Sequence, residues 1–206
     1  MTRWIVVELQ GKQYLLEQPH IQYYEFATRN FIKHQNLFPL IENLRQNKDA
    51  LPKAESDTAW FEFHETRINV LLYGALSLEA YINYYAKRYD IPFNNDFESK
   101  LSTINKWKIY PNLKLKKTIE GSRLKKLREI FDLRDGFVHP KPERVVKDPS
   151  VPYKANSPGA KLEQLDKGQL LADINSIYQD LFKIDKDEQL AHDKTPWLCI
   201  LNKQQS

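Results

Sequence analysis

The spacing of hydrophobic residues along the chain predicts a series of helices. Aromatic and aliphatic side chains recur every three or four positions between residues 21 and 46, as in a helix with one buried face. Pro39 predicts a break or a kink within this helix. A second helix is predicted over residues 57–89, and its middle, residues 70–86, is apolar nearly all round. We therefore expect the second helix to lie at the centre of the fold, with neighbours on every side.

Three further helices are predicted in the second half of the chain. A short helix over residues 97–107 is closed by Pro111, and a longer one over residues 118–139 stops at a proline. Residues 140–159 contain five prolines, which predicts a loop. A last helix is predicted over residues 161–186, where leucine and isoleucine recur at spacings of three and four.

The two ends of the chain carry short apolar segments. Residues 4–9 and 13–16 favour strands, and the Gly11-Lys12 pair between them predicts a small β-hairpin. The tail around residues 197–201 is apolar enough to dock on the rest of the protein, and one arrangement for it is a strand beside the hairpin. The pattern as a whole predicts an all-α fold with a small N-terminal β-hairpin appendage.

Composition restricts the class of protein without naming a function. The chain has 206 residues, of which 41% are hydrophobic and 12% aromatic, so it has enough apolar surface to build a core. Its net charge of +4 is too small to establish a nucleic-acid partner by itself. The longest strongly apolar run, residues 70–78, is too short for a membrane span, so we expect no membrane partner and a cytoplasmic location. A single cysteine, Cys199, excludes an internal disulfide.

Several common enzymatic motifs are missing from the sequence. There is no G-x-G-x-x-G, no G-x-x-x-x-G-K-[ST] and no G-x-S-x-G, and His64-Glu65 lacks the second histidine of a zinc protease motif. We therefore expect neither a metal ion nor a cofactor. His20, His34 and His192 have no neighbouring sequence that ties them to a nucleophile, and we predict that they are solvated surface residues.

Arg134 occupies an unusual position in the helix predicted over residues 118–139. At 100° per residue it falls about 20° from Leu127, in the middle of the apolar stripe. An unpaired charge there would cost several kcal/mol, so the guanidinium needs a counter-charge or a cleft to open into. Glu79 and Asn83 lie four residues apart on one face of the central helix and are the expected supporting partners.

His139 follows five residues later, at the end of the same helix. Histidine transfers protons in either direction near neutral pH, which makes it a common general acid or base. However, Arg134 and His139 are about 140° apart around the helix. They converge only if the helix end turns His139 back, or if a second copy of the helix brings its own pair. The alternative for His139 is a plain cap at the helix C-terminus.

The run Leu133-Arg134-Asp135-Gly136-Phe137-Val138-His139 resembles the R-x4-H signature of the HEPN superfamily. The segments at residues 78–83 and 124–128 also resemble sequences of that group. The resemblance covers roughly residues 58–142 and includes the last helix as a fold element. It implies an up-and-down helical bundle that often forms homodimers, in which two R-x4-H motifs face each other across a cleft.

We expect the chain to have three parts. These are a hairpin appendage over residues 1–18, a HEPN-like helical domain over residues 19–190 and a C-terminal tail over residues 191–206. The hairpin and the apolar tail do not belong to the common core of the superfamily.

Active members of the superfamily are metal-independent endoribonucleases, frequently toxins of toxin–antitoxin or other defence systems. The resemblance implies that His139 acts as general base or acid on the RNA 2′-hydroxyl and the leaving oxygen. It implies that Arg134 holds the scissile phosphate, and that Asp135 orients one of these two. RNA, a second copy of the chain and an antitoxin protein are the implied partners. The alternative is an inactive HEPN module that binds a partner protein or nucleic acid, in which Arg134 serves packing or dimerisation.

A basic segment precedes the motif and supports a nucleic-acid partner. Residues 100–128 contain ten basic residues and one acidic residue. We expect a phosphate-binding surface here, with Trp107 and Tyr110 available to stack bases. The alternative is a solvated helix face, which is what such runs usually form. The substrate-binding candidates are Lys125, Lys126, Arg128 and Lys141.

Overall fold

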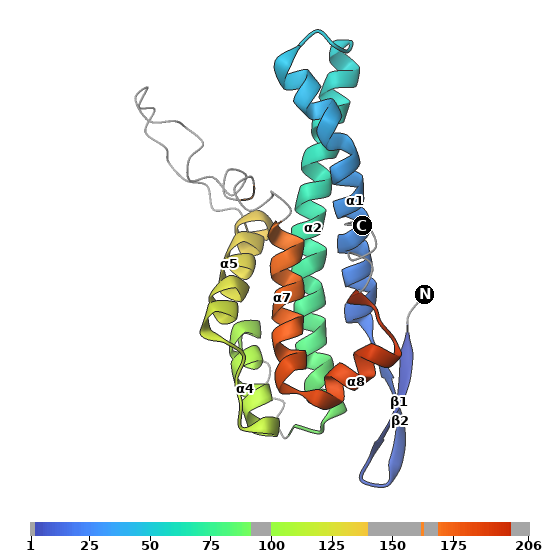
Figure 1. Cartoon of the computed structure of the whole chain (residues 1–206), viewed down its shortest axis with the longest axis vertical. Coiled ribbons are helices and arrows are strands. Elements are labelled where there is room, and N and C mark those ends of the chain that lie inside the picture. Colours follow the sequence, from blue (N-terminus) through green and yellow to red (C-terminus); the bar gives the residue numbers. More distant parts are fainter. Residues whose placement is uncertain (1–2, 92–99, 140–161, 163–168, 199–206) are drawn as a thin grey trace.

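The computed structural model describes residues 3–91, 100–139, 162 and 169–198, and it confirms the predicted all-α fold with an N-terminal hairpin (Figure 1). Two long antiparallel helices, α1 and α2, form one side of the bundle, and α7, α5 and α4 pack against α2. The elements are β1 (Trp4–Leu9), β2 (Lys12–Glu17), α1 (Pro19–Gln46), α2 (Lys53–Arg88), α4 (Thr103–Leu115), α5 (Gly121–Val138), α7 (Gln169–Ile184) and α8 (Lys186–Lys194). None of these helices combines the length and the hydrophobicity that a bilayer crossing requires.

The hairpin forms where the sequence predicts it. Its two strands pair antiparallel from Trp4 opposite Glu17 to Leu9 opposite Lys12. The two turn residues, Gln10 and Gly11, have positive φ angles of 52° and 73°. Two positive φ angles are typical of the tight two-residue turn that matches the twist of paired strands, and glycine adopts this geometry at little cost.

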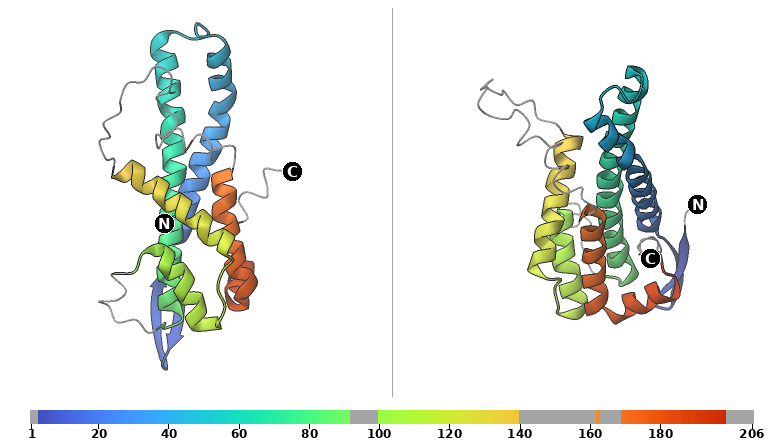
Figure 2. Two further views of the ribbon diagram at one scale, coloured as in Figure 1. Left: turned by 90° about the vertical axis from the view of Figure 1, so that its left-hand side faces the viewer. Right: turned by 45° about the horizontal axis from the view of Figure 1, so that its top comes forward.

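Helices α1 and α2 are longer than the sequence predicts. Of the break or kink expected at Pro39, the break is absent, because α1 continues through this residue to Gln46. Proline has no backbone N–H, so Pro39 removes one hydrogen bond from the helix. The packing of α1 against α2 stabilises the helix on both sides of Pro39 and outweighs this loss. The upper ends of both helices extend beyond α5 and α7 and share a small second core of Ile41, Leu44, Ala59 and Phe63 (Figures 1 and 2).

The expectation that residues 70–86 lie at the centre is confirmed. Helix α2 contacts α1, α4, α5 and α7, and most of its middle turns are buried. Gly74 faces α7, and a Cβ built on it would lie 2.3 Å from Cδ1 of Ile174. A side chain at this position therefore requires the Ile174 side chain to shift.

Gly74→Leu is expected to destabilise the protein by roughly 1–3 kcal/mol, because the added side chain has no space beside Ile174. Urea unfolding measures the change. Gly121→Ala is the matched control, since a Cβ there meets no atom within 4 Å and should leave the stability within about 0.5 kcal/mol. Shortening Ile174 to alanine in the Gly74→Leu background should recover part of the loss. Equal stability of Gly74→Leu and wild type would contradict this account of the packing.

Helix α4 differs from the prediction in where it ends and in the role of its aromatic residues. It begins after Ser102, whose side chain accepts the N–H of Asn105, and it continues through Pro111, where the sequence predicts its end. Trp107 and Tyr110 are fully buried against α2, so the prediction that they stack bases is wrong. The Trp107 ring stacks on a tyrosine of α2, and its Nε1–H donates to the carbonyl of Leu78 at 3.1 Å. Trp107 and Tyr110, three residues apart on one face of α4, therefore belong to the hydrophobic core.

The predicted last helix is divided into two. The described residues place α7 over Gln169–Ile184 and a separate α8 after it, which begins where Asp185 accepts the N–H groups of Asp187 and Glu188. Helix α8 continues beyond residue 190, the predicted end of the helical domain. The predicted start of the last helix, residues 161–168, lies outside the described residues apart from Leu162.

The apolar tail docks on the bundle, as predicted, but its described part is not a strand. Trp197 and Leu198 are buried, and the Trp197 ring packs edge-on against Tyr24 and Tyr178 at 5.2 and 4.8 Å between ring centres. Within the described residues the sheet contains β1 and β2 alone. Trp197 therefore packs between α1 and α7 in the aromatic core.

Buried carboxylates fix α8 to the rest of the bundle. Glu188 accepts hydrogen bonds from the hydroxyls of Tyr81 and Tyr89 and forms an ion pair of 3.0 Å with Arg88. Asp185, the residue that caps α8, accepts hydrogen bonds from a tyrosine of α2 and a lysine of α4. Burial and the neighbouring Glu188 raise the pKa of Tyr81, which keeps its hydroxyl protonated as a donor.

Candidate functional site

One stripe of α2 remains uncovered while the rest of its middle is buried. Its members recur at spacings of three and four and therefore lie on one helix face. The stripe forms the floor of a pocket of about 350 Å³, whose opposite wall comes from the end of the hairpin and the start of α1. The stripe residues are Leu76, Glu79, Ala80, Asn83 and Lys87.

Arg134 lies at the edge of this stripe. Helix α5 crosses α2 obliquely (Figure 2, left), and the Arg134 Nη1 donates to Oε2 of Glu79 at 3.1 Å. The Nε and Nη2 atoms of Arg134 both donate to Oδ1 of Asp135, at 2.9 and 2.6 Å. The guanidinium also lies 4.7 Å from the ring centre of Phe131. The side chain is 23% exposed, so the guanidinium is held in place but not sealed off from solvent.

The expected partnership of Arg134 with Glu79 is therefore present, but Asn83 has a different partner. The side-chain oxygen of Asn83 accepts a hydrogen bond from Nζ of Lys106 at 2.9 Å. Lys106 belongs to α4, and this contact brings a second cation to the stripe. In the sequence, Lys106 is only one member of the basic segment, because no local pattern reveals which helix it faces.

His139 caps the C-terminus of α5 and is exposed. Its backbone N–H donates to the carbonyl of Asp135 at 2.8 Å. The 140° rotation about α5 separates its side chain from Arg134 within one chain, so the structure does not bring the two together. Asp135 bonds to both residues, through its side chain to Arg134 and through its backbone to His139.

The basic candidates do not form one continuous surface. Lys126 pairs with Asp173 of α7 at 3.0 Å, so it ties two helices together. Lys125 is 80% exposed but lies about 180° around α5 from Arg134. Arg128 is exposed and lies within about 20° of the direction of His139. Lys141 lies outside the described residues.

Part of the predicted phosphate-binding segment is used by the fold itself. Besides Lys126, Lys114 pairs with Asp185 at 2.7 Å and lies 3.2 Å from the ring centre of Tyr89. Lys116 and Lys117 are exposed at the end of α4. The local excess of positive charge is therefore divided between buried ion pairs and solvated side chains.

The prediction that His20, His34 and His192 are surface residues is wrong. His20 and His34 are buried, and the side chain of His192 is mostly covered. They lie among aromatic rings, for example His34 at 4.1 Å from the ring centre of Phe63. Burial and the positive charge of Arg88 together lower the pKa of His20 to about 3. The missed signal was the place of His20 and His34 on the same face as the apolar residues of α1.

Among the residues that the structure describes, no three His, Cys, Asp or Glu side chains are grouped as a metal site requires. No protein-family model matches the chain, and no curated protein and no solved structure matches it either. The HEPN resemblance therefore stays a prediction that rests on Leu133–His139 and the two segments upstream. The geometry of Arg134, Asp135, Glu79 and His139 is the basis for a functional assignment.

Proposed function

We propose that this protein is a metal-independent endoribonuclease of HEPN type. One observation carries the proposal: Glu79 and Asp135 hold the Arg134 guanidinium at a partly exposed edge, and the exposed His139 ends the same helix. A guanidinium has five N–H groups, and the contacts to Glu79 and Asp135 use three of them. Two therefore remain for the oxygens of a phosphodiester.

The reaction needs no co-reactant beyond the RNA. The ribose 2′-oxygen attacks the neighbouring phosphorus, an O2′–P bond forms, and the bond from phosphorus to the 5′-oxygen breaks. An imidazole takes the 2′-hydroxyl proton, and an imidazolium supplies a proton to the leaving 5′-oxygen. Arg134 stabilises the negative charge that develops on the phosphoryl oxygens. The products are a 2′,3′-cyclic phosphate and a 5′-hydroxyl.

A homodimer would complete this site. His139 and Arg134 of one chain lie on different sides of α5, whereas two copies packed near their motifs would place the histidine of one beside the arginine of the other. The two imidazoles would then divide the general-base and general-acid tasks. RNA in the cytoplasm is the proposed substrate, and an antitoxin protein is the proposed regulator of such an activity.

The pocket beside Glu79 supports single-stranded RNA as the substrate form. Lys87 belongs to the stripe that carries Glu79 and Asn83, and Lys106 donates to Asn83, so two cations beside the pocket would attract the phosphates of an RNA strand. Tyr23 contributes a ring to the opposite wall. Unstacked bases bind well to such aromatic walls, whereas a duplex does not present its bases in this way.

A second candidate is the catalytically inactive HEPN module that binds a partner protein or nucleic acid. Two carboxylates, those of Glu79 and Asp135, already neutralise Arg134, and this favours the second candidate. Such partly exposed ion pairs are sufficient to explain an arginine beside α2. In that case Arg134 positions α5 on α2, and His139 is only a helix cap.

The two candidates differ in a cleavage assay on the purified protein. With EDTA present, we expect labelled single-stranded RNAs to be cut into fragments that end in 2′,3′-cyclic phosphate and begin with a 5′-hydroxyl. Sedimentation of the same sample reports whether the active species is a dimer. Intact RNA after long incubation with a folded dimer would favour the binding module, and cleavage that depends on an added divalent metal would overturn the proposed mechanism.

A further inference from the structure

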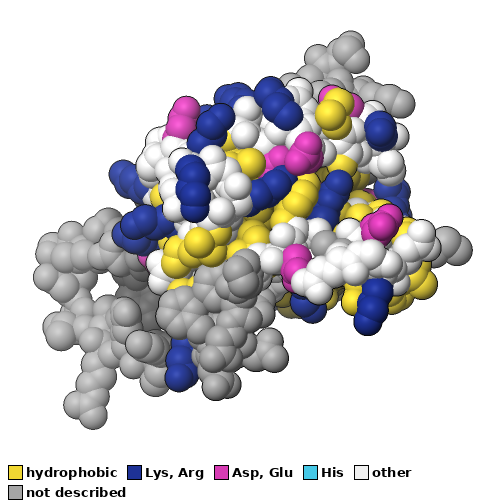
Figure 3. Space-filling model, turned by 90° about the horizontal axis from the view of Figure 1, so that it is seen from below, with side chains coloured by type: hydrophobic (Ala, Val, Ile, Leu, Met, Phe, Trp, Pro, Cys, Tyr) yellow, Lys and Arg dark blue, Asp and Glu magenta, His cyan; other side chains and the backbone are white. Residues whose placement is uncertain are grey.

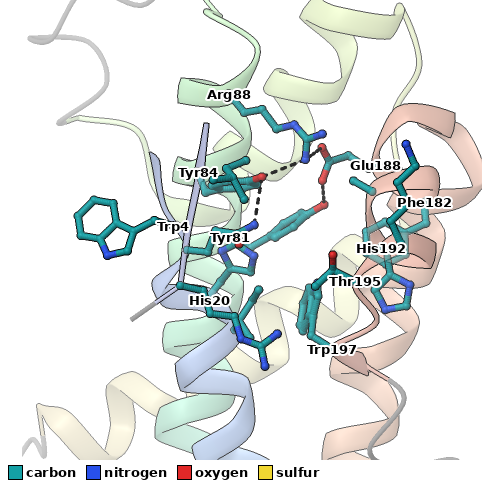
Figure 4. A pocket seen from close by; sticks show the side chains of 16 residues that line it. Trp4, His20, Tyr81, Tyr84, Arg88, Phe182, Glu188, His192, Thr195 and Trp197 are labelled. Carbon is teal, nitrogen blue, oxygen red and sulfur yellow. Dashed lines mark hydrogen bonds and ion pairs between the residues drawn. The ribbon is translucent and has the colours of Figure 1, made fainter. Parts of the chain in front are cut away.

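A pocket separate from the Arg134 site lies where the hairpin, the start of α1, the end of α2 and α8 meet (Figure 4). Its volume is about 470 Å³, within the range of small-molecule sites and too small for a folded partner. Side chains from segments far apart in the sequence line this pocket, so no local sequence motif predicts it. The residues that carry its chemistry are Gln18, His20, Tyr84, Arg88, Lys194 and Trp197.

The walls of this pocket are largely aromatic. The imidazole of His20 lies between the rings of Tyr84 and Trp197, with 4.7 and 5.3 Å between ring centres. Phe182 and His192 contribute two more rings on the side of α7 and α8 (Figure 4). Such walls favour a planar ligand that can stack on a ring face or meet a ring edge.

His20 brings an unsatisfied polar group to this wall. Its side chain is buried, and within the described part of the chain its Nδ1 has no hydrogen-bond partner. A buried polar atom without a partner costs about 1–3 kcal/mol, and proteins usually keep such an atom where a ligand or water satisfies it. The ring is neutral at physiological pH, so the unsatisfied Nδ1 can donate or accept one hydrogen bond, according to the tautomer.

The charges of the pocket select an anion. The one carboxylate in its lining, Glu188, already accepts hydrogen bonds from two tyrosines and pairs with Arg88 at 3.0 Å. It is therefore not available to a cationic ligand. Lys194 lies exposed at the rim, and Arg3 lies there in an exposed pair with Glu25. Seen from below, Lys and Arg side chains are scattered over the described surface, with some Asp and Glu side chains and apolar surface between them (Figure 3).

We propose that this pocket binds a nucleoside monophosphate. This ligand class combines a planar heteroaromatic base for the rings around His20, hydrogen-bonding groups for His20 and Gln18, and a phosphate for Lys194 and Arg3. Within the described residues, the hydrogen bonds of Arg134 and His139 involve none of these residues, so nucleotide binding does not require RNA cleavage, although Tyr84 lines both this pocket and the one beside Glu79.

Calorimetric titration of the full chain with AMP, GMP, CMP and UMP tests the proposal. We expect saturable binding of at least one of the four, with inorganic phosphate alone and the corresponding nucleoside alone each binding at least tenfold more weakly. Equal binding of phosphate and nucleotide would reduce the site to a simple anion site and overturn the assignment. No binding by any of the four nucleotides would overturn it as well.

Two charge reversals on α8 provide a matched pair. Lys194 lines the pocket, whereas Lys186 is exposed in the first turn of the same helix and does not line it. Lys194→Glu should weaken nucleotide binding at least tenfold, and Lys186→Glu should change it less than twofold. Equal effects of the two variants would show that the nucleotide binds elsewhere. His139→Ala should bind the nucleotide as wild type does, whether or not the protein cuts RNA.

Discussion

Replacing His139 with alanine is expected to reduce the rate of RNA cleavage by at least about 100-fold, because general acid–base transfer contributes about 10²- to 10⁴-fold to such reactions. The side chain is exposed at the end of α5, so its loss should leave the helical bundle folded. Initial rates on a labelled RNA, measured in EDTA, give the effect on the reaction. Circular dichroism and urea unfolding show whether the variant is still native.

His64→Ala is the matched control for this variant. His64 is also exposed, but it lies on α2 four turns before Glu79, on the extended end of the α1–α2 pair. Its removal should leave the cleavage rate within about twofold of wild type. Equal rates for His139→Ala and wild type would remove the imidazole from the mechanism. Loss of activity in both variants would indicate a structural effect instead of a catalytic one.

Arg134→Lys separates catalysis from packing in the same assay. Lysine keeps the positive charge beside Glu79 and Asp135 but loses the planar fork that donates to two acceptors at once. If Arg134 holds the scissile phosphate, lysine should lower the cleavage rate with little change in stability. If Arg134 serves only packing, Arg134→Lys should be more stable than Arg134→Ala. In that case the wild-type protein should not cleave RNA either.

Acid is expected to destabilise the protein through His20. In the unfolded chain this histidine binds a proton near pH 6.5, whereas in the folded protein burial and Arg88 lower its pKa to about 3. Between these values the unfolded state binds more protons than the folded state. The contribution of His20 to the free energy of unfolding is therefore fully present above pH 6.5. It falls by about 1.4 kcal/mol for each pH unit as the pH drops toward 3.

The His20→Phe variant isolates this contribution, since phenylalanine keeps a ring between Tyr84 and Trp197 but binds no proton. Urea unfolding at pH 7, 6, 5 and 4 should show a steeper loss of stability in wild type than in the variant. The other titratable groups are the same in the two proteins, so their contributions cancel in the comparison. His192→Phe should change the slope less, because His192 is less buried and Asp193 opposes the lowering of its pKa. Parallel pH profiles of wild type and His20→Phe would contradict this account.

Local patterns in the sequence determined the elements of this fold. The spacing of apolar residues predicted α1, α2 and α5, and the Gly11 turn predicted the hairpin, because these features depend on residues a few positions apart. The same reasoning did not predict that the helices continue through Pro39 and Pro111. A proline removes one hydrogen bond, but its effect on a helix depends on how strongly a neighbouring helix holds the two halves together.

The candidate residues around Arg134 were also found from one sequence. A charge in the middle of an apolar stripe requires a partner, and Glu79 is the partner that the structure provides. The uses of Lys106, Lys114 and Lys126 were not predictable, because a lysine in a basic segment carries no sign of which helix it will face.

The sequence by itself determined that this chain forms helices with a hairpin, and that Arg134 needs a counter-charge. Tertiary structure alone decided that Trp107 enters the core and that His20, Arg88 and Glu188 meet at one end of the bundle. The physical reason is the range of the interactions. Helix formation and stripe patterns act over one or two turns, whereas desolvation of a histidine and pairing of a buried carboxylate depend on segments more than 60 residues apart.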